Sequence, residues 1–187
     1  MEFKTTQNSS LPRDGLGLDR ESDRHTYRIE ARPNCINKVH VPKIILHETS
    51  LHFIAHGRQQ ECYVLWSGKL QLPDEAHITR CIHPVHGSTI ASISIDLEEN
   101  FRIQKLLANS QEFLFAQVHT HPGEAFHSFM DNHFPFSRKP GFFSIVVPRF
   151  GQNQLDNLGL CQVYEYIGEG KWKQLSKREV AVRFPVQ

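Results

Sequence analysis

The chain contains the apolar run Glu112-Phe-Leu-Phe-Ala-Gln-Val118, followed directly by His119-Thr-His121-Pro122. Residues 112–118 are predicted to form a buried strand, because a mostly apolar run of this length is typical of one. Alternate residues of a strand point to the same face, so we expect His119 and His121 to lie side by side if the strand continues through them. Pro122 cannot donate to a sheet ladder and is expected to end the strand. Two neighbouring imidazoles are suited to bind a metal ion.

A short polar motif follows at Ser128 and, three residues later, Asp131. Taken alone, this pair predicts a helix N-cap and a first-turn acid that satisfy free backbone amides. The histidines upstream favour a different interpretation, in which Asp131 joins His119 and His121 as a third metal ligand. Zinc binds imidazole nitrogen and carboxylate oxygen, and a catalytic zinc site keeps three protein ligands and an open fourth position.

These residues resemble the signature of the JAMM (MPN) metallopeptidases, which is His-x-His-Pro, a short loop, Ser-x-x-Asp and a glutamate far upstream. The matching residues are His119, His121, Pro122, Ser128 and Asp131. The interval between His121 and Ser128 is one residue shorter than in the usual eukaryotic pattern. The resemblance covers about residues 40 to 165. It implies one zinc ion per chain and an α/β fold, the JAB/MPN cytidine-deaminase-like three-layer sandwich with a mixed central sheet.

The resemblance also implies a glutamate that takes a proton from the attacking water without binding the metal. We predict Glu61, because it precedes an apolar run and a glycine at residues 62–68, as the family's glutamate does. Without the downstream motif Glu61 would be interpreted as a solvated charge at a strand start. Glu48, on a predicted helix, and Glu124, in the loop beside the metal, are the alternatives. Ser128 is predicted to donate a hydrogen bond to the developing oxyanion.

The nearest resemblance is to stand-alone bacterial JAMM peptidases that accompany ubiquitin-like conjugation enzymes in antiviral systems. It implies hydrolysis of the bond after the C-terminus of a ubiquitin-like protein, either to process a precursor or to remove a conjugate. E1-like and E2-like enzymes of the same system are the further partners implied. The alternative is a non-catalytic MPN scaffold that binds such partners, although scaffolds usually lack part of the ligand set kept here. A nucleobase deaminase would need His-x-Glu and Pro-Cys-x-x-Cys motifs, which this chain lacks.

Charge and hydropathy exclude several classes of partner. The 187 residues carry 21 Lys and Arg against 20 Asp and Glu, so no nucleic-acid or membrane partner is expected, and a RadC-like DNA-associated protein lacks support. No apolar run approaches the roughly twenty residues of a membrane span, and the polar start lacks the apolar stretch of a secretory signal. A cytoplasmic location is therefore expected. The four cysteines form no C-x-x-C pair and are expected to be reduced.

The chain divides into a polar N-terminal tail or docking arm at residues 1–30 and a predicted metallopeptidase domain at residues 31–187. One helix is predicted from Val41, with Pro42 in its first turn and Gly57 at its end, and another from Asp96. A mixed sheet is expected to carry the metal site at its edge. Besides the histidine strand, strands are predicted at residues 61–66, 78–82, 90–95, 142–147, 161–167 and 180–184.

Most of the other histidines lack partners at the spacing of metal ligands. Five of them are predicted to be surface or hydrogen-bonded core residues: His52, His56, His77, His83 and His86. His127 and His133 flank the short helix that would carry Asp131, on different faces from it. We predict that these two support the site without binding the ion.

Overall fold

The computed structural model describes residues 35–57, 59–89, 93–152 and 155–187. The predicted arm at residues 1–30 lies outside them. Along the chain the elements are β1 (Lys38–His40), α1 (Lys43–Ala55), β2 (Tyr63–Leu72), β3 (Glu75–Ile82), β4 (Gly87–Ser88), β5 (Ile93–Ser94), α2 (Leu97–Ser110), β6 (Phe113–Thr120), α3 (Phe129–His133), β7 (Phe143–Val147), a 3-10 turn (Arg149–Gly151), β8 (Gln162–Gly168), β9 (Lys171–Gln174) and α4 (Lys177–Arg183).

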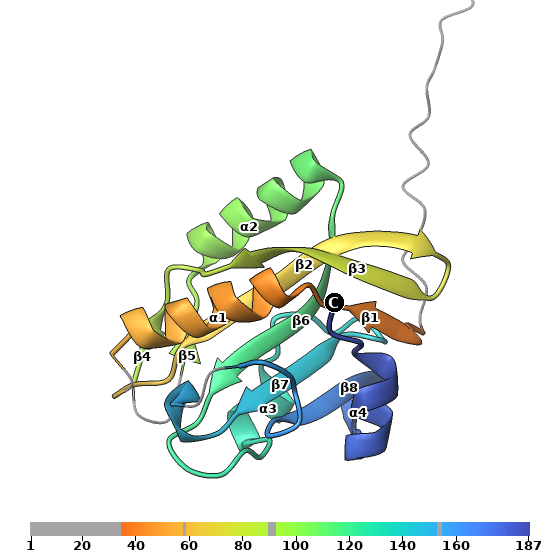
Figure 1. Cartoon of the computed structure of the whole chain (residues 1–187). Coiled ribbons are helices and arrows are strands. Elements are labelled where there is room, and N and C mark those ends of the chain that lie inside the picture. Colours follow the sequence, from red (N-terminus) through yellow and green to blue (C-terminus); the bar gives the residue numbers. More distant parts are fainter. Residues whose placement is uncertain (1–34, 58, 90–92, 153–154) are drawn as a thin grey trace, which may run out of the picture. The chain divides into compact units, whose positions relative to one another are not determined.

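Seven strands form one mixed sheet in the order β1-β3-β2-β6-β7-β8-β9, and β4 pairs with β5 separately (Figure 1). β1 runs parallel to β3, and β6 runs parallel to β7. The other neighbouring strands are antiparallel. At Gly68 an added Cβ would overlap the backbone oxygen of His77 in β3, so glycine allows β2 and β3 to approach closely there.

Helices pack on both faces of the sheet. Val64 and Trp66 of β2 belong to the apolar cluster that contains residues of α1 and α4. Tyr63 and Leu65 belong to a second cluster, to which α2 contributes Ile103. Because alternate residues of β2 belong to different clusters, the clusters lie on opposite faces. The prediction of an α/β fold with a mixed sheet is therefore confirmed, whereas the specific JAB/MPN arrangement stays a prediction.

The two long helices begin close to the predicted positions. Asp96 is the N-cap of α2, and its carboxylate accepts a hydrogen bond from the backbone amide of Glu99 at 2.7 Å. Pro42 is the N-cap of α1 with an extended backbone, rather than a residue of the first turn. Gly57, just after α1, adopts φ +86°, a conformation that glycine takes at little cost.

The prediction of a strand at residues 180–184 is wrong, because α4 occupies this region. Ser176 and Glu179 form a capping box: the Ser176 hydroxyl accepts from the Glu179 amide at 3.2 Å, and the Glu179 carboxylate accepts from the Ser176 amide at 2.8 Å. Val180 and Phe184 are buried, whereas Val182 between them is 62 % exposed, which is helical spacing. The Ser-x-x-Glu pattern was the sequence signal for this helix.

The remaining strands lie near their predicted positions, with changed ends. The strand predicted at residues 61–66 begins at Tyr63 and continues to Leu72. Of the strand predicted at 90–95, residues 90–92 lie outside the described part of the chain, and β5 covers Ile93–Ser94. The short strands β1 and β9 were not predicted.

The candidate site lies at the end of a central strand, so the expectation of a site at the sheet edge is wrong. β6 is the fourth of seven strands and lies between β2 and β7. After Thr120 the chain leaves the sheet, forms α3 and returns as β7. The carboxyl end of β6 is therefore bounded by two strands and by the segment that carries α3.

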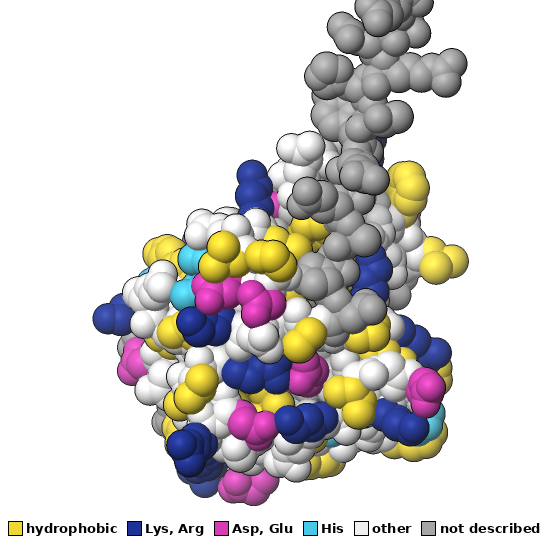
Figure 2. Space-filling view, turned by 90° about the vertical axis from the view of Figure 1, so that its right-hand side faces the viewer, with side chains coloured by type: hydrophobic (Ala, Val, Ile, Leu, Met, Phe, Trp, Pro, Cys, Tyr) yellow, Lys and Arg dark blue, Asp and Glu magenta, His cyan; other side chains and the backbone are white. Residues whose placement is uncertain are grey.

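Charged side chains of both signs are interspersed with hydrophobic ones on the face shown in Figure 2. None of the helices in the described ranges has both the length and the apolar character needed to cross a membrane.

Candidate metal centre

The carboxyl end of β6 places two histidines beside each other. His119 is in the strand, and its Cα lies opposite those of Tyr63 in β2 and Val146 in β7. His121 follows the strand, and its amide donates to the carbonyl of Val147 at 2.9 Å. Their ring centroids are 5.1 Å apart, and both side chains are almost fully buried. The structure thus brings the two rings together as the strand period predicted.

The α3 helix supplies the acid of the site. Ser128 is its N-cap, and the Ser128 hydroxyl accepts a hydrogen bond from the Asp131 amide at 3.2 Å. One oxygen of the Asp131 carboxylate accepts from the Ser128 amide at 2.7 Å. The N-cap interpretation of the motif is therefore confirmed, and the capping box that starts α3 also fixes the carboxylate beside the histidines, while its role as a metal ligand stays a prediction.

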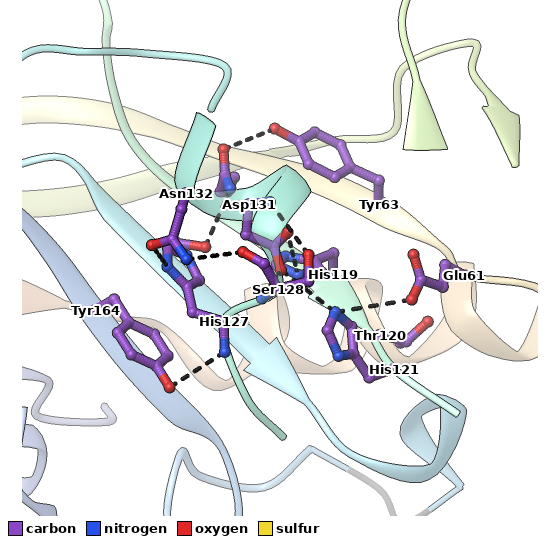
Figure 3. Close-up of polar contacts among 12 residues, drawn as sticks. Glu61, Tyr63, His119, Thr120, His121, His127, Ser128, Asp131, Asn132 and Tyr164 are labelled. Carbon is purple, nitrogen blue, oxygen red and sulfur yellow. Dashed lines mark hydrogen bonds and ion pairs between the residues drawn. The ribbon is translucent and has the colours of Figure 1, made fainter. Parts of the chain in front are cut away.

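The three predicted ligands converge on one point (Figure 3). The Nε2 atom of His119 is 3.0 Å from one Asp131 oxygen, and the Nε2 atom of His121 is 3.5 Å from the other. Bond lengths of about 2.0 to 2.2 Å place the ligand atoms of a tetrahedral zinc ion roughly 3.4 Å apart. The observed distances therefore suit a zinc ion held by these three side chains.

The unpaired Nε2 atom of His119, which faces Asp131, favours a metal over a hydrogen-bond network. Both ring nitrogens of His119 and the Nδ1 atom of His121 are buried without a hydrogen-bond partner among the described residues. The contact between His119 Nε2 and Asp131 is short, yet it lacks the alignment of a hydrogen bond. A buried polar group left unpaired costs about 1 to 3 kcal/mol, and a bound ion would remove part of this cost by accepting a lone pair.

Glu61 lies at the edge of this group without belonging to it. Its carboxylate is 3.7 Å from the Nε2 atom of His121, and its side chain is buried. Its amide donates to the carbonyl of Thr89 at 3.0 Å, which fixes the backbone before β2. Burial raises the pKa of Glu61, and the neighbouring histidines only partly oppose this. A carboxylate with a raised pKa beside a metal position is suited to accept a proton.

The Asp131 carboxylate has the opposite electrostatic environment. Burial alone would raise its pKa, but His119, His121 and Ser128 outweigh burial and hold the pKa of Asp131 well below its ordinary value. Asp131 therefore stays ionised and can bind a cation, whereas Glu61 is suited to exchange a proton. Two acids in one site with different environments are typical of divided roles.

The alternative bases lie elsewhere. Glu124 is 86 % exposed in its side chain and pairs with Arg149 at 3.5 Å. Glu48 is a half-buried residue of α1, on the sheet face opposite Tyr63. Among the three candidates, Glu61 is the one placed within 4 Å of a predicted ligand.

Two residues of the site were not predicted. The hydroxyl of Tyr63 donates to the side-chain oxygen of Gln117 at 3.1 Å, and the same oxygen accepts from the amide of Phe136 at 3.0 Å. Gln117 also donates to the Ser144 hydroxyl at 3.0 Å. This network ties β6 to the segment after α3. The signal in the sequence was the period of two, because Gln117 precedes His119 by two positions.

His127 and His133 lie next to the site and outside the three-residue group. His127 stacks on Tyr164 at 4.2 Å, and its Nδ1 atom is 3.0 Å from the Asn132 side-chain oxygen. Burial lowers the pKa of His127 to about 4. His133 stacks on Phe129 near the surface. These contacts suit the predicted supporting role, which stays a prediction.

A pocket of about 370 Å³ opens onto the site. Its polar lining includes Glu61, Tyr63, Gln117, His119, Ser128 and Asp131. Met130 and Phe134, which also line it, expose apolar side chains. A larger hollow of about 460 Å³ beside α4 is lined by no acid or histidine, so we place the chemistry at the smaller pocket.

Comparison with known proteins points in the same direction. No family profile matches the chain. The chain is 26% identical over 145 residues to "Probable metalloprotease y4jG" of Sinorhizobium fredii, which covers 75% of this chain and 88% of that protein. A Desulfitobacterium hafniense protein with a known solution structure superposes with a TM-score of 0.59 at 14% identity, covering 80% of this chain and 92% of that one. The second likeness shows a shared fold alone.

Proposed function

We propose that the protein is a JAMM-type zinc peptidase that hydrolyses the bond after the C-terminus of a ubiquitin-like protein. The observation that carries this proposal is the convergence of His119, His121 and Asp131 beside the buried Glu61. The likeness to a protein named a probable metalloprotease supports the peptidase part. The ubiquitin-like substrate, the E1-like and E2-like partners and a role in an antiviral conjugation system rest on the motif resemblance.

The reaction assigns separate tasks to the residues of the site. His119, His121 and Asp131 would hold Zn²⁺, which lowers the pKa of water to about 7 and polarises a carbonyl group. Glu61 accepts the proton of the attacking water and passes it to the leaving amine. The Ser128 hydroxyl donates to the oxyanion that forms on the scissile carbonyl.

Ser128 can perform this task while it caps α3. Its oxygen accepts a hydrogen bond from the Asp131 amide, so the hydroxyl proton can still be donated to the substrate. We expect Ser128→Ala to lower kcat about 100 to 1,000-fold and to cost about 1 kcal/mol of stability through the lost cap. Steady-state kinetics and thermal unfolding measure the two effects. Ser176→Ala removes the matching cap of α4 and should change stability alone. An unchanged kcat in Ser128→Ala would show that Ser128 does not stabilise the oxyanion.

The pocket is suited to an extended peptide. Ile93 and Ser94 of β5 line one side of it, and β5 pairs only with β4 among the described strands. A substrate tail can add to such a strand through backbone hydrogen bonds. The partly exposed side chains of Met130 and Phe134, which line the same pocket, offer apolar contacts. A flexible C-terminal tail fits this geometry better than a folded surface does.

The test is cleavage of ubiquitin-like proteins that carry either a C-terminal extension or an isopeptide-linked lysine peptide. Mass spectrometry should show release at the last residue of the ubiquitin-like protein, and a chelator should stop the reaction until zinc is added back. The preferred substrate then separates precursor processing from deconjugation. Zinc-loaded protein that binds these substrates without cleaving them would contradict the proposal in favour of a non-catalytic scaffold.

A further inference from the structure

A second group of potential metal ligands lies outside the lining of the pocket described above. It contains His56, Cys62, His83 and His86, and one potential ligand atom of each lies within 4.8 Å of the others. His56 directly follows α1, Cys62 directly precedes β2, and the other two lie between β3 and β4. The group thus joins three segments that are distant in sequence. Figure 1 shows the end of α1 next to β4, where His56 Nε2 is 2.8 Å from the Ser88 hydroxyl.

His86 gives the strongest indication of a missing partner. Its Nδ1 atom lies 2.8 Å from the carbonyl of Pro84, which can only accept, so Nδ1 carries the proton. The Nε2 atom therefore carries a lone pair, and it is buried without a hydrogen-bond partner among the described residues. Metal-binding histidines typically donate the other ring N–H to a backbone carbonyl in this way.

Cys62 and His83 have the spacing of two ligands of one ion. The Sγ atom of Cys62 is 3.6 Å from the Nε2 atom of His83. Bond lengths of about 2.3 Å to sulfur and 2.0 Å to nitrogen give a separation of about 3.5 Å across a tetrahedral zinc ion, close to this distance. The same distance also serves a weak S–H···N hydrogen bond, so it is the lone pair of His86 that favours a metal.

The ligand types of the group favour a soft cation, because it combines one thiol with three imidazoles. A cysteine binds a metal as the thiolate, so the metal must displace the proton of Cys62 on binding. One thiolate and three imidazoles form a closed four-ligand set, as structural zinc sites have.

A third group, His40, Glu75 and His77, carries no such indication. The Nε2 atom of His40 is 3.2 Å from the Glu75 carboxylate, and its Nδ1 atom is 2.8 Å from the Gln187 side chain. Both nitrogens already have partners, and Lys38 also binds Glu75. This group is explained by hydrogen bonds and ion pairs.

We propose that His56, Cys62, His83 and His86 bind a second zinc ion, which cross-links the end of α1, the start of β2 and the loop after β3. The ion would restrain the backbone on the C-terminal side of Glu61, because Cys62 is the next residue. The Glu61 amide is already bound to Thr89, which follows β4. The site is thus a structural support for the proposed base and takes no part in the reaction.

Cobalt substitution tests this site separately from the His119 site, because only the second site contains a thiolate. Metal-free full-length protein is titrated with Co²⁺ in a reductant that does not bind metals. We expect a sulfur-to-cobalt charge-transfer band that saturates within two equivalents in wild-type protein, saturates at one equivalent in His119→Ala and disappears in Cys62→Ser. Cys35→Ser, which changes an exposed thiol, is the matched control and should keep the band.

Zinc content gives an independent readout. Wild-type protein should bind two zinc ions per chain, and His119→Ala and His83→Gln should each bind one. His83→Gln retains the Cys62 thiol, so its zinc content tests the second site even if Cys62→Ser folds poorly. His52→Phe keeps a ring to stack on His83 and should still bind two ions. A wild-type protein without the thiolate band, whose zinc is lost completely in His119→Ala, would overturn the second site and leave the proposed peptidase site intact.

Discussion

Replacing Glu61 with glutamine is expected to lower the rate of hydrolysis about 100 to 10,000-fold while zinc remains bound at the His119 site. Glutamine keeps the shape of the side chain but cannot accept a proton from water. Glu61 approaches His121 at 3.7 Å and lies outside the group of predicted ligands, so its charge is not needed to hold the ion. Single-turnover cleavage and elemental analysis of the same preparation measure both quantities.

Glu124→Gln is the matched control for this variant. Glu124 precedes α3 in the loop beside the metal position, but its carboxylate is exposed and paired with Arg149. Its replacement should leave the rate within about twofold of wild type, since exposed ion pairs contribute little. A Glu61→Gln protein with full activity would assign the proton transfer to another group. Loss of zinc in this variant would instead make Glu61 a ligand.

Replacing Asp131 with alanine is expected to remove both zinc binding at this site and activity. Changes to groups that merely support a ligand cost about 10 to 100-fold in metal affinity, so loss of the ligand itself should cost more than about 100-fold. Zinc titration against a chelating indicator measures this loss. The titration is best done in a Cys62→Ser background, so that one site is counted.

The Asp131 variant also loses the capping box of α3, so two further variants separate the two causes. Asp131→Asn keeps an oxygen that can accept from the Ser128 amide but removes the negative charge. Glu179→Gln alters the equivalent acid in the capping box of α4, far from the site in sequence. We expect weak zinc binding in Asp131→Asn and unchanged binding in Glu179→Gln. If Asp131→Ala bound zinc with wild-type affinity, Asp131 would not be a zinc ligand.

Much of the fold could be predicted because local rules and packing agree. β6 follows from a mostly apolar run, and α2 follows from a capping pattern with an apolar face. The error at α4 arose because a short segment with alternate apolar residues fits both the two-residue period of a strand and the 3.6-residue period of a helix. The capping residues Ser176 and Glu179 before it identify the helix. β1 and β9 have few apolar residues, and their pairing with β3 and β8 comes from tertiary contacts.

The candidate metal centre could be predicted more fully than the second group of histidines. His119, His121 and Asp131 lie within thirteen residues, so strand and short-helix periods bring them together locally. Cys62 and His83 meet because β2 and β3 are antiparallel, which places the residue before one strand near the residue after the other. Predicting that Cys62 and His83 are close requires the pairing and register of β2 and β3, and the spacing of residues in the sequence does not give these.

The pairing of β6 on both sides limits where this protein can gain or lose residues during evolution. His119 lies opposite Tyr63 and Val146, so a one-residue insertion within the strand would turn its imidazole to the other face of the sheet. The loop after Pro122 has no such restriction, because Gly123 is exposed and a side chain added there would meet open space. Changes in length among relatives should therefore accumulate between Pro122 and His127, while the spacing of the two histidines stays constant.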